Sequence, residues 1–255
     1  MQEYPVIRLI AADRNKVALR RFLSLFSTDV LVRGANFLLI PVFLHLMTRE
    51  EFGVYGYLYS FAMAMSLVFT LGFHASVPKL FADTKSDKKA QGSMLFTLSL
   101  TLIVGLVLIF SLISLTGIDE YFFGLINRNE EMKNFSYDTY RPYLLVAMAS
   151  MVLSNLLTYY FVAAEKIKNI QAFNLIRFFF ANGLAILLLY TAPDADAALL
   201  RLSVTYIVEL LLCCVFSFFL CKNFTFKFSK YYLYKGLKIG LPLSFVALLN
   251  AISNF

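Results

Sequence analysis

Residues Gly92 to Thr116 read GSMLFTLSLTLIVGLVLIFSLISLT, a run of 25 residues without a charged side chain. An α-helix of about 20 apolar residues crosses the roughly 30 Å of hydrocarbon in a bilayer, so this run predicts a membrane-spanning helix. Of the 255 residues in the chain, 60% are hydrophobic and 15% are charged, which is well below the roughly 25% charge of a soluble domain. The sequence therefore predicts an integral membrane protein of the all-α class.

Further apolar blocks on either side of this run predict a polytopic helix bundle with six complete transmembrane helices and the start of a seventh. The complete helices are expected at Phe22 to Leu46, Phe52 to Val77, Gly92 to Thr116, Pro142 to Ala163, Gln171 to Thr191 and Ala198 to Leu220, and the seventh begins near Leu237. The expected organisation is an N-terminal segment (1–21), a six-helix lobe (22–220), a basic linker (221–236) and the first part of helix 7 (237–255).

Lysine and arginine concentrate on alternate loops of this predicted topology. Most of them lie in the N-terminal segment and in the loops around Lys85 to Lys89, Lys166 to Lys168 and Lys222 to Lys238. Cytoplasmic loops are enriched in positive charge, so the N-terminus is expected to be cytoplasmic and the protein to lie in the cytoplasmic (inner) membrane. The same pattern explains the net charge of +7 without nucleic acid as a partner.

Three polar residues share one face of the first apolar block. Asp29 and Arg33 are four residues apart and Asn36 follows three residues later, which aligns the side chains along a helix. A charge in hydrocarbon costs about 2.5 to 3.5 kcal/mol, so such residues usually serve a function. The forked guanidinium of Arg33 is suited to hold a phosphate, with Asp29 orienting it. The alternative is a self-contained ion pair that only makes insertion tolerable.

Glu209 lies near the centre of the sixth block, and the side chains one turn away carry no opposite charge. Its expected partner is Arg33, or a proton that makes it a neutral hydrogen-bond donor. Asparagine residues also join membrane helices, and an arginine near a helix end can extend to the headgroups, so Asn155 and Arg177 are weaker candidates. The candidate residues of a substrate-binding cavity are Asp29, Arg33, Asn36, Asn155, Arg177 and Glu209.

Motifs of soluble enzymes are absent from the sequence. It contains no Walker loop, dinucleotide fingerprint, His-Glu-x-x-His or Gly-x-Ser-x-Gly. The three cysteines, Cys213, Cys214 and Cys221, lack the spacing of a metal site or a disulfide framework. No metal, cofactor or catalytic residue is therefore expected. Enzyme chemistry would have to use the acidic loop from Asp119 to Asp138, which is better explained by solvation.

Four stretches of the chain resemble those of a known transporter family. They are the junction LMTREEFGVYG (46–56), the Leu-Gly-Phe turn (71–73), the connection between Tyr160 and Phe178, and KGLKIGLPL (235–243). In order and in spacing relative to the predicted helices, they are similar to polysaccharide flippases of the Wzx type. These flippases belong to the multidrug/oligosaccharidyl-lipid/polysaccharide exporter superfamily.

The resemblance implies two helical lobes around a central cavity that works by alternating access. It implies a polyprenyl-pyrophosphate-linked oligosaccharide as substrate, moved across the membrane for surface polysaccharide such as O-antigen or capsule. By analogy with related flippases, Asp29 and Arg33 would face the pyrophosphate. A polysaccharide polymerase or a chain-length regulator is an expected partner, beside membrane lipid. Because members of the family contain more helices than this sequence, the chain is expected to be a fragment that holds the first lobe.

Two other functions remain open from the sequence. A multidrug or cation antiporter of the same superfamily would favour acidic groups in its cavity, and Arg33 counts against it. A membrane-embedded glycan-modifying enzyme would need acid-base residues at one membrane face.

Overall fold

The structure is a computed structural model that describes residues 5–70, 72–117, 137–192, 196–221 and 225–253. These residues form eight α-helices and no β-strand, which confirms the predicted all-α class. The helices are α1 (Pro5–Leu46), α2 (Arg49–Phe69), α3 (Phe73–Thr84), α4 (Lys88–Thr116), α6 (Tyr137–Ala163), α7 (Ile167–Thr191), α8 (Ala197–Cys221) and α9 (Lys230–Ser253). The acidic loop between α4 and α6 lies outside the described residues, apart from Asp138 at its end.

Five of the described helices are long and apolar enough to cross a membrane. They are Leu25–Leu46 within α1, and α4, α6, α7 and α8 over the lengths Lys88–Thr116, Tyr137–Ala163, Ile167–Thr191 and Ala197–Phe219. The chain is therefore a multi-pass membrane protein.

The second predicted span, Phe52 to Val77, is wrong as a single helix. The chain turns after α2, and Gly72 adopts a left-handed backbone (φ 67°) directly before α3. The backbone N–H of Phe73 then donates to the carbonyl oxygen of Thr70 (2.8 Å), which closes the turn. Glycine populates this conformation at little cost. A single glycine hardly changes the average hydropathy of the block, so hydropathy alone does not predict the helix break.

Two predicted boundaries also differ from the structure. α1 begins at Pro5, inside the segment 1–21 that was expected to precede the first helix, and α9 begins at Lys230 rather than near Leu237. Proline is favoured in the first turn of a helix, and the residues after Pro5 include many strong helix formers such as alanine, leucine, arginine and lysine. Hydropathy detects the apolar part of a helix and not its polar continuation.

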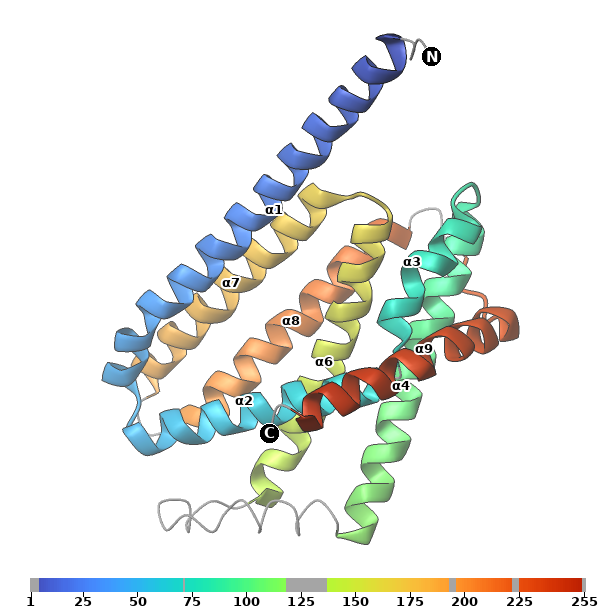
Figure 1. The fold of residues 1–255 in the computed structure, drawn as a ribbon. Helices are drawn as coiled ribbons and strands as arrows, with labels where there is room; N and C mark the ends of the chain where they lie inside the picture. Colours follow the sequence, from blue (N-terminus) through green and yellow to red (C-terminus); the bar gives the residue numbers. More distant parts are fainter. Residues whose placement is uncertain (1–4, 71, 118–136, 193–195, 222–224, 254–255) are drawn as a thin grey trace.

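The helices pack around α6, which contacts α2, α3, α4, α7 and α8. In its apolar window 50% of the residues are buried, against 6% in that of α1. Figure 1 shows why: α1 runs beside α7 at the margin of the bundle, and its N-terminal part projects beyond the other helices. The buried core extends on both sides of α6 and draws on all the helices from α1 to α8 that the structure describes; Phe73, Leu98 and Phe161 are among its almost fully inaccessible residues.

The start of α2 is fixed by a capping box. The backbone N–H of Thr48 donates to Glu51 Oε2 (2.8 Å), and the backbone N–H of Glu51 donates to Thr48 Oγ1 (3.2 Å). This reciprocal pair satisfies backbone donors that a helix start leaves free. The other carboxylate oxygen of Glu51 accepts from the backbone N–H of Ala197 (3.3 Å), the first residue of α8. The junction between the first two apolar blocks thus ties α2 to α8.

Two of the family-like stretches meet where α9 crosses the turn between α2 and α3. A Cβ atom on Gly72 would lie 2.0 Å from the carbonyl oxygen of Gly240 in α9. A Cβ on Gly236 would lie 3.0 Å from the ring of Phe73 and from Leu98. Glycine at both positions therefore allows α9 to pack directly on α3 and α4.

One end of the bundle, which we call the basic end, is formed by residues 84–89, 163–168 and 225–230. Its parts are joined by the hydroxyl of Tyr160, which donates to Gln91 Oε1 (3.2 Å), and by Thr225 Oγ1, which donates to the carbonyl oxygen of Lys89 (3.1 Å). Exposed lysines gather here at positions 85, 88, 89, 166, 168, 227 and 230. The burial of the Lys166 ammonium, with an added contribution from the charge of Lys88, lowers the pKa of Lys166.

Candidate functional site

A polar cavity of about 570 Å³ lies among α1, α2, α6, α7 and α8. Three charged residues line it: Arg177, Arg201 and Glu209. The neutral polar residues of the lining are Asn36, Tyr55, Tyr59, Ser66, Ser154, Asn155, Asn182, Thr205 and Tyr206. Two arginines and one glutamate leave an excess of one positive charge, which favours an anionic ligand.

Arg177 and Glu209 form an ion pair between α7 and α8. Arg177 Nη1 lies 2.8 Å from Glu209 Oε1, and the side chains are 37% and 5% exposed. The carboxylate is thus removed from solvent and partnered, whereas the guanidinium remains partly open. Since a guanidinium has five N–H donors, Arg177 can bind Glu209 and still donate to a second anion. The pair holds the arginine in place without neutralising the cavity as a whole.

Within the described residues, Arg201 is held by aromatic rings and pairs with no carboxylate. Its guanidinium carbon lies 3.5 Å from the ring centroid of Phe43, 3.9 Å from that of Tyr55 and 5.3 Å from that of Phe52. Cation–π contacts of this kind stabilise a cation without cancelling its charge. Arg201 therefore presents a full positive charge at the cavity wall.

The charged residues of α8 are aligned by helix periodicity. Arg201, Thr205 and Glu209 follow one another at intervals of four, which puts them on one face. The hydroxyl of Thr205 is turned back to the carbonyl oxygen of Arg201 (2.7 Å). Eight residues separate Arg201 from Glu209, so the two charges lie about 12 Å apart along the helix axis. The cavity therefore has two cationic positions, one at Arg201 and one at the Arg177–Glu209 pair.

Neutral polar groups complete the wall. The side-chain amide of Asn182 donates to the carbonyl oxygen of Phe178 (2.9 Å), which leaves its own oxygen as an acceptor. Tyr206 is 1% exposed, and its hydroxyl has no hydrogen-bond partner within the described part of the chain. A buried hydroxyl of this kind is usually satisfied by water or a ligand. The wall thus combines hydrogen-bonding groups with the aromatic faces of Tyr55 and Tyr59, whose ring centroids lie 6.2 Å apart.

Four of the six residues predicted from the sequence line this cavity: Asn36, Asn155, Arg177 and Glu209. Asp29 and Arg33 do not. They form the predicted ion pair, with Arg33 Nε 2.8 Å from Asp29 Oδ2, but their side chains are 58% and 79% exposed on α1. Their role as substrate contacts stays a prediction.

The predicted contact between Glu209 and Arg33 is wrong, because Glu209 pairs with Arg177. α8 packs against α7, whereas α1 lies beyond α7 at the margin of the bundle (Figure 1). Sequence reasoning also missed Arg201, which lies near the start of the sixth predicted helix and was not among the candidate residues. The spacing of Arg201, Thr205 and Glu209 at four residues was the signal that places all three on one helical face.

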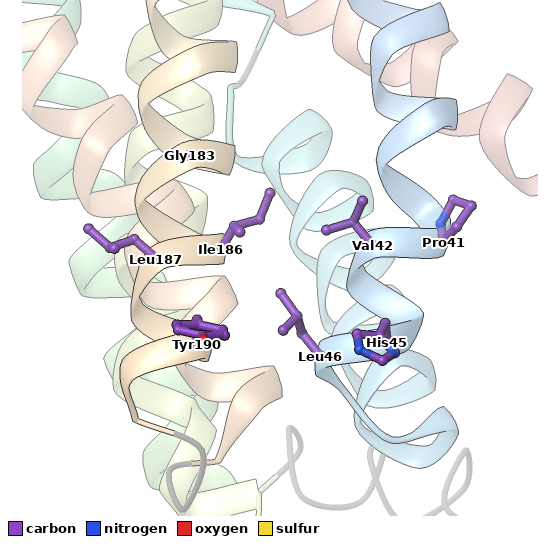
Figure 2. A pocket seen from close by; sticks show the side chains of 8 residues that line it. All are labelled: Pro41, Val42, His45, Leu46, Gly183, Ile186, Leu187 and Tyr190. Atoms are coloured by element: carbon purple, nitrogen blue, oxygen red, sulfur yellow. The ribbon is translucent and has the colours of Figure 1, made fainter.

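A second, mostly apolar hollow of about 700 Å³ lies along the contact between α1 and α7, which we call the α1–α7 seam. Figure 2 shows Val42 and Leu46 of α1 facing Ile186 of α7 across this hollow. Gly183 at its edge directly follows Asn182 of the polar cavity. The seam therefore passes from polar to apolar lining within one turn of α7.

The sequence matches the family described as "Polysaccharide biosynthesis protein" over residues 18–255. Comparison with curated proteins and with solved structures gives no match. The matched range contains the apolar part of α1, the helices that line the polar cavity, and α9. The chain therefore belongs to the polysaccharide biosynthesis protein family.

Proposed function

We propose that the protein is a flippase that carries a polyprenyl-pyrophosphate-linked oligosaccharide across the cytoplasmic membrane by alternating access. In this proposal residues 22–220 form the first lobe, the basic end faces the cytoplasm, and residues from 237 onward begin the second lobe. The observation that carries the proposal is the polar cavity inside a membrane helix bundle, where the charged groups among the described lining residues are two arginines and one carboxylate.

Each part of the substrate has a counterpart in the described residues. The pyrophosphate accepts hydrogen bonds from the guanidinium groups of Arg177 and Arg201. Sugar rings stack on Tyr55 and Tyr59 and bond to the asparagines of the wall. The polyprenyl chain lies in the apolar α1–α7 seam, where it stays in contact with the bilayer. The two cationic positions, about 12 Å apart along α8, let the anionic headgroup pass from one to the other during translocation.

A cation antiporter of the same superfamily is the second candidate, and the charge of the site disfavours it. Such a transporter needs a carboxylate that is free to bind a cation. Glu209 is instead occupied by Arg177 at 2.8 Å. A bound cation would also be repelled by Arg201.

The test is replacement of Arg201 in the full-length protein, in a strain that lacks its own flippase. We expect Arg201→Gln to abolish surface glycan while the amount of protein in the membrane stays normal, and Arg201→Lys to restore part of the export. Arg141→Gln is the matched control, because Arg141 lies outside the cavity and contacts Ser114 (2.9 Å) and Asp138 (3.7 Å). Normal export by Arg201→Gln would exclude Arg201 as a substrate contact.

Arg33→Ala in the same assay tests the exposed pair on α1. Loss of glycan at normal abundance would make Arg33 a substrate contact, as the family resemblance implies. Unchanged export would leave the Asp29–Arg33 pair with a structural role only.

A further inference from the structure

A third hollow, a groove with a volume of about 210 Å³, runs between α4 and α8. None of its described lining residues also lines the polar cavity. α4 and α8 both pack on α6 and diverge from one another, so the leucines of α6 form the floor. The lining is almost entirely apolar and includes Leu95, Phe96, Ile103 and Leu157. Cys214 of α8 is exposed at its edge, which shows that the groove opens toward the surroundings of the bundle.

The length of the groove matches one leaflet of a bilayer. On α4 its lining runs from Gly92 to Ile103, which is about 16 Å along the helix axis. Half of the hydrocarbon core of a bilayer is about 15 Å. The lining residues of α8, Cys213, Cys214 and Ser217, belong to the end of that helix near the basic end. The groove therefore occupies the leaflet on the side of the basic end.

The mouth of the groove is built by the segment 225–229, which crosses the start of α4. Ser93 Oγ donates to the carbonyl oxygen of Lys227 (2.5 Å), and the backbone N–H of Ser229 donates to Thr97 Oγ1 (2.9 Å). These bonds hold Phe226 against Phe96, with ring centroids 5.6 Å apart. Phe226 thus lines the groove at its mouth, so the apolar lining continues to this end.

Two exposed lysines belong to the backbone segments that meet at this mouth. The hydroxyl of Thr225 bonds to the backbone of Lys89, so the exposed residues Lys89 and Lys227 come from adjacent backbone segments. Lys89 precedes Gly92 by three residues, or about 4.5 Å of helix. The adjacent acid, Asp87, accepts the backbone N–H groups of Lys89 (2.8 Å) and Ala90 (3.2 Å) as the N-cap of α4. None of the described lining residues is acidic.

We infer that this groove is a binding site for an anionic phospholipid of the surrounding bilayer. One acyl chain lies in the groove between α4 and α8, and the phosphate contacts the ammonium groups of Lys89 and Lys227. An apolar slot one leaflet deep, with two lysines at its headgroup end, fits an anionic lipid better than a zwitterionic one, because the latter brings its own cation to the lysines. The site is independent of the proposed transport function.

Native mass spectrometry of the purified full chain in detergent tests the inference. The protein is titrated with phosphatidylglycerol and with phosphatidylcholine of the same acyl chains, and the dissociation constant of the first retained lipid is measured. We expect about thirtyfold tighter binding of phosphatidylglycerol, since each of the two lysines near the headgroup contributes on the order of 1 kcal/mol. K89Q combined with K227Q reduces this affinity to that for phosphatidylcholine.

A substitution inside the groove separates the acyl-chain contact from the charge. Ser217→Trp fills the groove and is expected to remove the retained lipid of either kind, and Cys214→Phe does the same if the first variant does not fold. The matched control is K79Q combined with K168Q, two exposed lysines outside the groove, which leaves both affinities unchanged.

Three outcomes of these titrations would overturn the inference. They are equal affinity of the unaltered chain for the two lipids, unchanged lipid retention by a folded groove-filling variant, and equal loss in the control pair. One-for-one displacement of phosphatidylglycerol by a polyprenyl phosphate would also overturn it, because the groove would then belong to the transported substrate. Export by K89Q/K227Q in the glycan assay reports on the proposed function separately.

Discussion

Glu209 and Arg177 show how a single buried charge is accommodated in this protein. Glu209 is 5% exposed in the middle of α8, and its carboxylate lies 2.8 Å from Arg177 Nη1. Removing a charge from water costs several kcal/mol, which a well-placed opposite charge offsets. The stability of the α7–α8 packing thus depends on both residues together, because either charge without its partner would destabilise the protein.

A double-mutant cycle at this pair tests that coupling. We expect Arg177→Met to lower the free energy of unfolding by about 3 kcal/mol, because Glu209 is left buried without a cation. Adding Glu209→Leu to the same chain should recover most of this loss. The measurement is denaturant unfolding of the purified protein in detergent. A double variant as unstable as Arg177→Met alone would show that the two charges do not depend on one another.

At the level of elements, the decisive contact is between the turn that separates α2 from α3 and the backbone of α9. Gly72 contributes a left-handed backbone and also the absence of a Cβ atom against Gly240. Gly117 has the same φ of 67°, but among the described residues no atom beyond its own helix and chain neighbours lies within 4 Å of the Cβ it would carry. These two glycines therefore share the conformational requirement, and only Gly72 has the packing requirement.

The pair Gly72→Ala and Gly117→Ala isolates the contact with α9. Both substitutions place alanine in a left-handed conformation, at a cost of about 1 to 2 kcal/mol. Gly72→Ala should cost about 1 to 3 kcal/mol more, because α9 must move away from the turn. Thermal unfolding in detergent measures the difference, and limited proteolysis before α9 reports its displacement. Equal losses in the two variants would mean that α9 does not pack on this turn in the membrane.

At the level of the whole molecule, the arrangement of α1 beside α7 places the apolar α1–α7 seam next to the polar cavity, and under the proposed function this seam is the path of the lipid chain. The apolar seam adjoins the cavity at Asn182 and Gly183. A lipid chain in the seam and a headgroup in the cavity would occupy the two hollows at the same time. This path requires that α1 and α7 separate slightly along the seam.

Cross-linking across the seam tests this path. Val42→Cys and Ile186→Cys introduce thiols whose parent side chains face one another in Figure 2. In the full-length protein with its native cysteines replaced, a reducible bifunctional cross-linker should stop glycan export, and reduction should restore it. Each single-cysteine variant, treated in the same way, should keep exporting. Normal export with the cross-link formed would show that the lipid chain enters elsewhere.

The amino-acid sequence is enough to show that the chain is a helical membrane protein of several spans, because long apolar runs such as Gly92 to Thr116 have no other stable form in a bilayer. The sequence also identifies the polar residues that are costly to place inside a membrane span. Four of these, Asn36, Asn155, Arg177 and Glu209, line one cavity. Burial cost is a local property of a residue in a span, so it can be inferred without a fold.

Which of these residues face one another follows from the packing of the helices and not from the sequence pattern. The partner of Glu209 is Arg177 and not Arg33, and Arg201 belongs to the cavity through rings contributed by α1 and α2. The helix break at Gly72 likewise has a packing role, because the backbone of Gly240, far along the chain, lies directly against it. Helix periodicity fixes the face on which a side chain lies, but the rotation and neighbours of each helix follow from packing against the others.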